Sequence, residues 1–78
     1  MDTMTRLETA LQALGLVGEV ALGGRWVKVQ GERCAVYVIE SIGQGYYMWC
    51  DHPEARLVQS YSDPTEAIQT GLRRAERR

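Results

Sequence analysis

The chain has 78 residues and a formal net charge of −1 at pH 7, with 45% hydrophobic and 24% charged residues. These values exclude a disordered chain, which has too few apolar side chains to form a core. The length suits one small domain that spans residues 1–78. The sequence has neither an apolar signal segment nor a run of ~20 apolar residues, so we expect a cytoplasmic protein without a membrane partner.

The charge is unevenly distributed along the chain. Residues 73–78 contain four Arg and one Glu, a net +3, and the rest of the chain carries −4. An acidic body is a poor partner for phosphate backbones, which reward clusters of Lys and Arg. A basic last turn instead complements the dipole of a C-terminal helix. We therefore do not expect nucleic acid as the main partner.

A helix is predicted near the N-terminus. Apolar side chains recur there at intervals of three and four residues and would form one stripe along a helix. Asp2 or Thr3 is expected to cap its first turn. Gly15 suits the left-handed residue that ends a helix, after which Leu16 is expected to fold back onto the last turn. The stripe consists of Met4, Leu7, Leu11 and Leu14.

Between residues 18 and 61 the apolar period changes from about 3.6 to about 2, which indicates β-strands. Glycines mark the turns at 23–24, at 31 and within 41–45. Pro53 marks a loop, because proline cannot donate to a central ladder. The expected strands are 19–22, 25–30, 33–40, 46–51 and 56–61.

Residues 63–66 give the clearest local signal in the chain. Asp63 suits the N-cap, Pro64 suits the first helical position, and Glu66 can complete a capping box. Gly71 costs ~1 kcal/mol relative to Ala in a helix, which indicates a close approach of this helix to the sheet. The apolar stripe consists of Ala67, Ile68, Gly71, Leu72 and Ala75. The predicted fold class is therefore α+β, with an N-terminal helix, an antiparallel sheet of three to five strands and a C-terminal helix.

Strand alternation sorts the sheet residues onto two faces. One face is aliphatic and suits the two helix stripes; it holds Val27, Val29, Cys34, Val36, Val38, Tyr46, Met48, Cys50 and Val58. The other face contains five of the six aromatic residues; it holds Trp26, Tyr37, Ile39, Tyr47, Trp49, Leu57 and Tyr61. So much exposed apolar area on a small domain usually marks a binding surface.

Three interpretations of the aromatic face are open. In the first, the helices cover opposite faces and the aromatic side chains are core. In the second, both helices pack on the aliphatic face and the other face forms a homodimer, through Trp26, Tyr37, Ile39, Tyr47, Trp49 and Tyr61. In the third, the face binds a ligand, another protein or single-stranded nucleic acid. Nucleic acid would need positive charge from Arg25, Lys28, Arg33 and Arg56.

Cys34, Cys50 and His52 are the candidates for soft metal ligands or for a nucleophile and its base. With Glu40 opposite Tyr46 in the hairpin, Cys34 lies opposite His52. A register shifted by two residues places Cys34 opposite Cys50 instead. Neither arrangement has the CxxC or HxxxH spacing of a zinc site. We therefore expect reduced, buried cysteines, no metal, no cofactor, no catalytic residues and no enzymatic activity.

Two families share parts of this pattern. The order of helix, strands and helix resembles double-stranded RNA-binding domains, but residues 62–66 read Ser-Asp-Pro-Thr-Glu where that family has a lysine cluster. Gly45, Tyr46 and Tyr47 resemble the glycine-aromatic entry to the second strand of HicB-like antitoxins. Residues 63–67 resemble the acidic start of the helix in that family. This second resemblance covers residues 36–75 and implies a module that binds a protein partner.

The expected function is that of a non-enzymatic protein-interaction domain, which self-associates as a homodimer through the aromatic sheet face. One alternative is a nucleic-acid-associated accessory protein that uses this face and the Arg-rich end. Others are a HicB-like partner-binding module and a small thiol or metal protein built on Cys34, Cys50 and His52.

Overall fold

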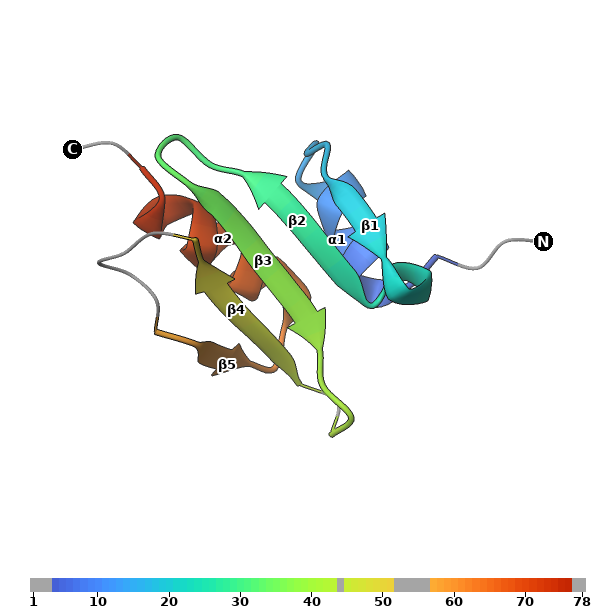
Figure 1. The fold of residues 1–78 in the computed structure, drawn as a ribbon. Helices are drawn as coiled ribbons and strands as arrows, with labels where there is room; N and C mark the ends of the chain where they lie inside the picture. The colour runs from blue at the N-terminus through green and yellow to red at the C-terminus, as the bar shows by residue number, and fades with distance from the viewer. Residues whose placement is uncertain (1–3, 44, 52–56, 77–78) are drawn as a thin grey trace.

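The computed structural model describes residues 4–43, 45–51 and 57–76. Across these residues the chain forms two helices, five strands and one short 3-10 turn (Figure 1). In chain order they are α1 (Arg6–Ala13), β1 (Glu19–Ala21), η1 (Leu22–Gly24), β2 (Trp26–Gln30), β3 (Ala35–Glu40), β4 (Tyr46–Cys50), β5 (Gln59–Tyr61) and α2 (Pro64–Arg74). The predicted α+β fold class is confirmed. In the described segments, no helix is long and apolar enough to cross a membrane.

The strands form one antiparallel sheet in the order β1-β2-β3-β4-β5, so each strand pairs with its neighbour in sequence. Glu40 lies opposite Tyr46, which is the first of the two registers expected for this hairpin. The loop between β3 and β4 is closed at its base, where the N–H of Ser41 donates to the carbonyl of Gly45 at 2.8 Å. The hydroxyl oxygen of Ser41 in turn accepts the N–H of Gly45 at 3.0 Å.

Two strands are shorter than the sequence predicts. β3 begins at Ala35 rather than at residue 33, because the N–H of Gly31 donates to the carbonyl of Cys34 at 2.9 Å and keeps this segment in a turn. β5 covers only Gln59–Tyr61 of the predicted 56–61, and Arg56 lies outside the described residues. The other strand boundaries agree with the prediction to within one residue.

α1 begins with a capping box. The hydroxyl oxygen of Thr5 accepts the N–H of Glu8 at 3.2 Å, and the Glu8 carboxylate accepts the N–H of Thr5 at 3.0 Å. The expected caps, Asp2 and Thr3, lie outside the described residues, and the N-cap is Thr5 instead. The prediction starts the helix too early because Met4 fits the helical period, although it precedes the helix and is 45% exposed.

The end of α1 confirms the predicted cap. Gly15 has a φ of +68°, and its N–H donates to the carbonyl of Gln12 at 3.0 Å. The N–H of Leu16 donates to the carbonyl of Leu11 at 3.0 Å. Leu16 therefore folds back against the helix and packs on the core.

Thr5 also fastens α1 to the turn between β1 and β2. Its hydroxyl donates to the carbonyl of Gly24 at 2.6 Å. Gly24 has a φ of +90°, and a Cβ at this position would lie 2.6 Å from the Thr5 methyl carbon. Both the backbone conformation and the contact with Thr5 require glycine here, so α1 is held against one corner of the sheet.

α2 begins where the sequence predicts. The carboxylate of Asp63, the N-cap, accepts the N–H of Glu66 at 3.1 Å, and Pro64 occupies the first turn. Within the described residues, only the Asp63 half of the proposed capping box is formed. Arg73 and Arg74 lie in the last turn, where cations stabilise the helix dipole.

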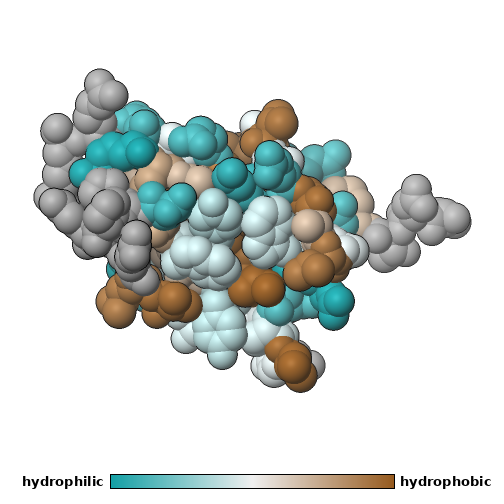
Figure 2. All heavy atoms as spheres, in the orientation of Figure 1, coloured by the Kyte–Doolittle hydropathy of each residue, from teal (hydrophilic) through white to brown (hydrophobic). Residues whose placement is uncertain are grey.

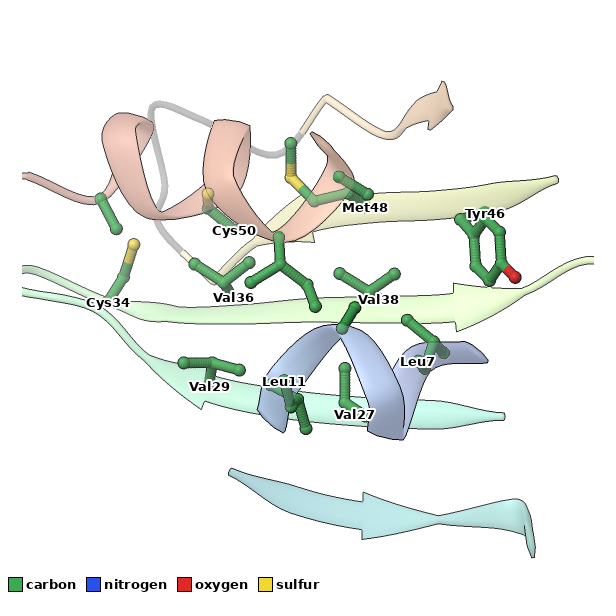
Figure 3. Packing of buried hydrophobic residues seen from close by; sticks show 14 residues of the cluster. Leu7, Leu11, Val27, Val29, Cys34, Val36, Val38, Tyr46, Met48 and Cys50 are labelled. Atoms are coloured by element: carbon green, nitrogen blue, oxygen red, sulfur yellow. The ribbon is translucent and has the colours of Figure 1, made fainter. Parts of the chain in front are cut away.

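Both helices pack on the same face of the sheet (Figure 1). α2 covers β3 and β4, α1 lies over β2, and the two helices contact each other. Figure 3 shows the core between the two layers. It contains Leu7, Ala10, Leu11, Val27, Val29, Cys34, Val36, Val38, Tyr46, Met48, Cys50, Ala67, Ile68 and Ala75. The aliphatic face is therefore core as predicted, except for Val58, and the interpretation with one helix on each face is wrong.

Gly71 marks the closest approach of α2 to the sheet. A Cβ at this position would overlap with Cγ1 of Val36 and lie 3.2 Å from Sδ of Met48. The predicted close approach is confirmed. The helix accepts a poor helix former here because its backbone packs directly on the side chains of β3 and β4.

Gly71→Ala tests this packing. Alanine is the better helix former by ~1 kcal/mol, so the substitution would stabilise an unobstructed helix. Here we expect the free energy of unfolding to fall by ~1–3 kcal/mol, because the methyl group overpacks Val36 and Met48. Urea denaturation measures the change. The exposed position Gln69→Ala serves as the control and should stay within ~0.5 kcal/mol of the wild type; a more stable Gly71→Ala protein would contradict the packing.

Candidate functional site

The sheet face opposite the helices carries the candidate site. Val27, Val38 and Met48 are fully buried beneath the helices, so the residues that alternate with them point to the other side. We call five of these residues the open face: Trp26, Tyr37, Ile39, Tyr47 and Trp49. Figure 2 shows pale aromatic side chains gathered over the central strands, with brown hydrophobic residues around them.

Three rings of the open face form a continuous row across β2, β3 and β4. Tyr37 stacks on Trp49 with ring centroids 5.4 Å apart and an interplanar angle of 10°. Trp26 lies 5.9 Å from Tyr37 at an angle of 46°. Rings that hold one another in place lose less conformational entropy when a partner binds. The row is therefore a pre-organised apolar surface.

Few charged groups accompany this row. Nζ of Lys28 lies 5.8 Å from the ring centroid of Tyr37, within the range of a cation–π contact. Glu19, on β1, is the neighbour of Lys28 across the strands. Asp51 is exposed directly after the end of β4. Glu19 and Asp51 lie at the margins, whereas Lys28 lies on β2 beside Tyr37, near the centre of the face.

Two of the arginines expected to supply positive charge are bound elsewhere. Nε of Arg25 donates to the carbonyl of Leu22 at 3.2 Å. A guanidinium nitrogen of Arg33 donates to the carbonyl of Arg74, at the end of α2, at 3.4 Å. Arg56 lies outside the described residues. Lys28 is thus the cation that the described sheet places beside the aromatic row.

Tyr61 does not belong to the open face. It lies opposite Tyr46, which is buried under the helices, and it packs against the core. The prediction extends strand alternation across residues 52–56, but parity is not maintained across a loop, and a shift of one residue inverts a strand. Ser60 takes the place of Tyr61 on the open side. The residues before β5 are exposed, at 67% for Leu57 and 55% for Val58.

Two exposed aliphatic side chains flank the open face at one end of the sheet, and sequence reasoning misses both. Leu22, between β1 and β2, is 59% exposed and has a φ of +55°, a conformation that costs a non-glycine residue ~1–2 kcal/mol. Ile42, between β3 and β4, is fully exposed. A shallow groove beside Ile42 is lined in part by Ile39 and Tyr47. The sequence does contain a signal for both residues, because each is an aliphatic residue next to a glycine in a turn.

Cys34 and Cys50 are buried free thiols on the helix side of the sheet (Figure 3). The Cys50 thiol donates to the carbonyl of Gly71 at 3.6 Å. Burial, followed by the neighbouring Cys34, raises the pKa of the Cys50 thiol above its ordinary value of 9.0. A buried, protonated thiol is a poor nucleophile and a poor metal ligand. His52 lies outside the described residues, and those described hold no group of three possible metal ligands.

No family model, curated protein or solved structure matches this chain. A function can therefore be inferred only from the chemistry of its own surfaces. Among the described surfaces, the open face has the most specific arrangement, because three of its rings form a row and Lys28 makes a cation–π contact with one of them.

The buried Cys50 and Tyr46 predict a loss of stability in alkali. Burial is the main cause that raises the pKa of both groups, above ordinary values of 9.0 and 10.0. In the unfolded chain both groups ionise at those ordinary values, whereas in the folded chain they stay neutral. Their contribution to the free energy of unfolding is therefore complete below about pH 9 and is lost as the pH rises further. Urea denaturation across this range should show the fall. Cys50→Ala should be less stable at neutral pH but should lose less on going to alkali; an unchanged alkaline dependence would exclude the Cys50 thiol as a source.

Proposed function

We propose that this domain is a non-enzymatic protein-interaction module that associates with a second copy of itself through the open face. One observation carries the proposal. Both helices pack on one side of the sheet, so the row of Trp26, Tyr37 and Trp49 lies on the side that no described element covers. Apolar patches of this kind usually mark interaction sites. Trp and Tyr are also the residues that dominate the centres of interfaces.

The distribution of charge supports a partner of the same composition. Two copies of the open face would bring their aromatic rings together, with Lys28 as the cation beside Tyr37 and with Glu19 and Asp51 as the anions at the margins. A strongly charged partner would find the single cation Lys28 near the centre of the described face rather than a cluster of charges of one sign. Self-association therefore needs no charged group beyond those that the described face carries.

The size of the open face limits the affinity expected between two copies. The five strands contain 3, 5, 6, 5 and 3 residues, which at ~3.4 Å per residue and ~4.8 Å between strands give a flat area of roughly 350 Å² per copy. Standard interfaces remove about 1,200–2,000 Å² of accessible surface in total. The flat areas of two copies together lie below this range, so a stable pair also needs the relief of the side chains and contacts beyond the flat face. We expect a dissociation constant in the micromolar rather than the nanomolar range.

Sedimentation velocity over micromolar concentrations tests self-association. The wild type should pass from monomer to dimer as the concentration rises. Trp49→Ala should weaken the dimer by about 30-fold, because a central ring is lost. Tyr47→Lys should also weaken it, and it is less disruptive to folding because Tyr47 is 46% exposed.

Val17→Lys provides the matched control. Val17 is 94% exposed and lies outside the open face, so the same kind of charge placed there should leave the dimer intact. A wild type that stays monomeric at high micromolar concentration would contradict the proposal. So would equal effects of Tyr47→Lys and Val17→Lys.

The stacked row favours one second candidate, single-stranded nucleic acid. Successive bases stack on aromatic side chains in such sites, but a positive groove must also follow the backbone. Lys28 is the described cation on the face, because Arg25 and Arg33 are engaged elsewhere. Quenching of tryptophan fluorescence by a short oligonucleotide at low salt tests this candidate. Salt-sensitive quenching by the wild type, lost in Lys28→Ala, would favour nucleic acid over self-association.

A further inference from the structure

We infer that the two copies pack with their strands running in the same direction, with the two-fold axis along β3. This arrangement rests on the self-association proposed above and specifies how the second copy is oriented. It follows from the order of residues in three rows that cross the open side of the sheet. The strand registers define these rows without any assumption about a partner.

Each row has its own character. The first row runs Trp26, Ile39, Tyr47 and is apolar. The middle row runs Lys28, Tyr37, Trp49 and contains the cation. The third row runs Gln30, Ala35, Asp51, where the N–H of Asp51 donates to the carbonyl of Ala35 at 2.9 Å. One end of the open side is therefore apolar and the other end is polar.

A two-fold axis through Tyr37 can lie across the strands or along them. Across the strands, β2 of one copy faces β2 of the other, so Lys28 meets its own counterpart. Two like charges are then buried together, which is unfavourable. Along the strands, β2 faces β4, and Lys28 of each copy lies over Trp49 of the other, an arrangement that extends the cation–π contact already made with Tyr37.

The same choice decides which rows meet. With the axis across the strands, the apolar row of one copy faces the polar row of the other, so Trp26 meets Gln30 and Tyr47 meets Asp51. With the axis along the strands, each row meets itself in reverse order. Trp26 then packs on Tyr47, and Ile39 packs on its own counterpart. Two sheets aligned within about 30° are a common form of face-to-face packing.

The exposed tips supply area that the open face alone lacks. The turns that carry Leu22 and Ile42 lie at the same end of the sheet as the apolar row (Figure 1). When the strands run in the same direction, these tips come together, because the β3–β4 turn with Ile42 lies over the β2 side of the other copy, toward the turn with Leu22. When the strands run in opposite directions, the tips face the polar end instead. A stable pair needs more than the flat face, and only the first orientation provides it.

Spin labels on single cysteines distinguish the two orientations. Ile42 and Glu32 are matched sites, because each lies five residues from Tyr37 on opposite sides. In Ile42→Cys and in Glu32→Cys, labels in a dimer should be about 10–20 Å apart when strands run in the same direction, since packed sheets lie ~10 Å apart. In the opposite orientation both pairs should be about 30 Å apart or more, at ~3.4 Å per residue. Cys34 and Cys50 are buried, so labelled wild type serves as the control for background.

Lys28→Met gives an independent measurement. It keeps an unbranched side chain that is one atom shorter, and it removes the charge. If Lys28 lies over Trp49 of the partner, the dimer should weaken by about 5-fold. If Lys28 meets its own counterpart, removal of the charge should strengthen the dimer. Short distances at both labelled sites together with weakening support the inference.

Long distances at both sites, one short and one long distance, or a tighter Lys28→Met dimer would each overturn this arrangement while leaving self-association intact. A chain that stays monomeric in every variant and in the wild type would instead overturn the proposed function. The two failures are therefore separated by sedimentation of the same labelled samples.

Discussion

The structure depends on the close contact of α2 with the middle of the sheet. Gly71 lets the helix backbone approach Val36 and Met48 so closely that a single methyl group would not fit. This contact places the stripe of Ala67 and Ile68 over β3 and β4. It also leaves room beside α2 for α1, which covers β2 and is fixed at its start by the bond from Thr5 to Gly24.

Because both helices cover one side of the sheet, the polarity of the side chains determines which residue types suit each side. Valine, leucine and isoleucine suit a dry layer between a helix and a sheet. Tyrosine and tryptophan carry polar groups that need a partner or water, so they suit a half-exposed surface. The sheet separates the two kinds by alternation. Tyr46 and Tyr61 are the exceptions on the core side, and each has a hydrogen-bond partner there. The Tyr46 hydroxyl donates to the Glu40 carboxylate at 3.5 Å, and the Tyr61 hydroxyl donates to the side-chain oxygen of Gln59 at 2.8 Å.

Local patterns in the sequence predict much of this fold. The cap at Asp63, the left-handed stop at Gly15 and the close approach at Gly71 each depend on a few adjacent residues, and each is confirmed. The assignment of β2, β3 and β4 to two faces is also correct, because continuous alternation spans each strand. Five of the six predicted interface residues therefore lie on one face of the sheet.

The errors arise where a prediction must cross a loop or choose between similar signals. Tyr61 is assigned to the wrong face because nothing in residues 52–56 fixes the phase of alternation in β5. The cap of α1 is placed too early, although Thr5 and Glu8 have the spacing of a capping box. Leu22 and Ile42 are missed because exposure at a turn depends on backbone conformation, which residue type alone does not give. Self-association is a property of two chains, so neither the sequence nor one folded copy tests it.

The sequential order of the strands has a consequence for how the chain folds. Every strand pairs with the next one along the chain, so each hairpin closes a short loop and pays little entropy before its contacts form. The hairpins can therefore form quickly, and until α2 packs on the sheet, its aliphatic face is uncovered over β3 and β4 as well as the open face. The outer strands β1 and β5 contain only three residues each, which gives an incoming chain little backbone to pair with. Short edges thus protect the nascent sheet during the interval before the last helix covers its core.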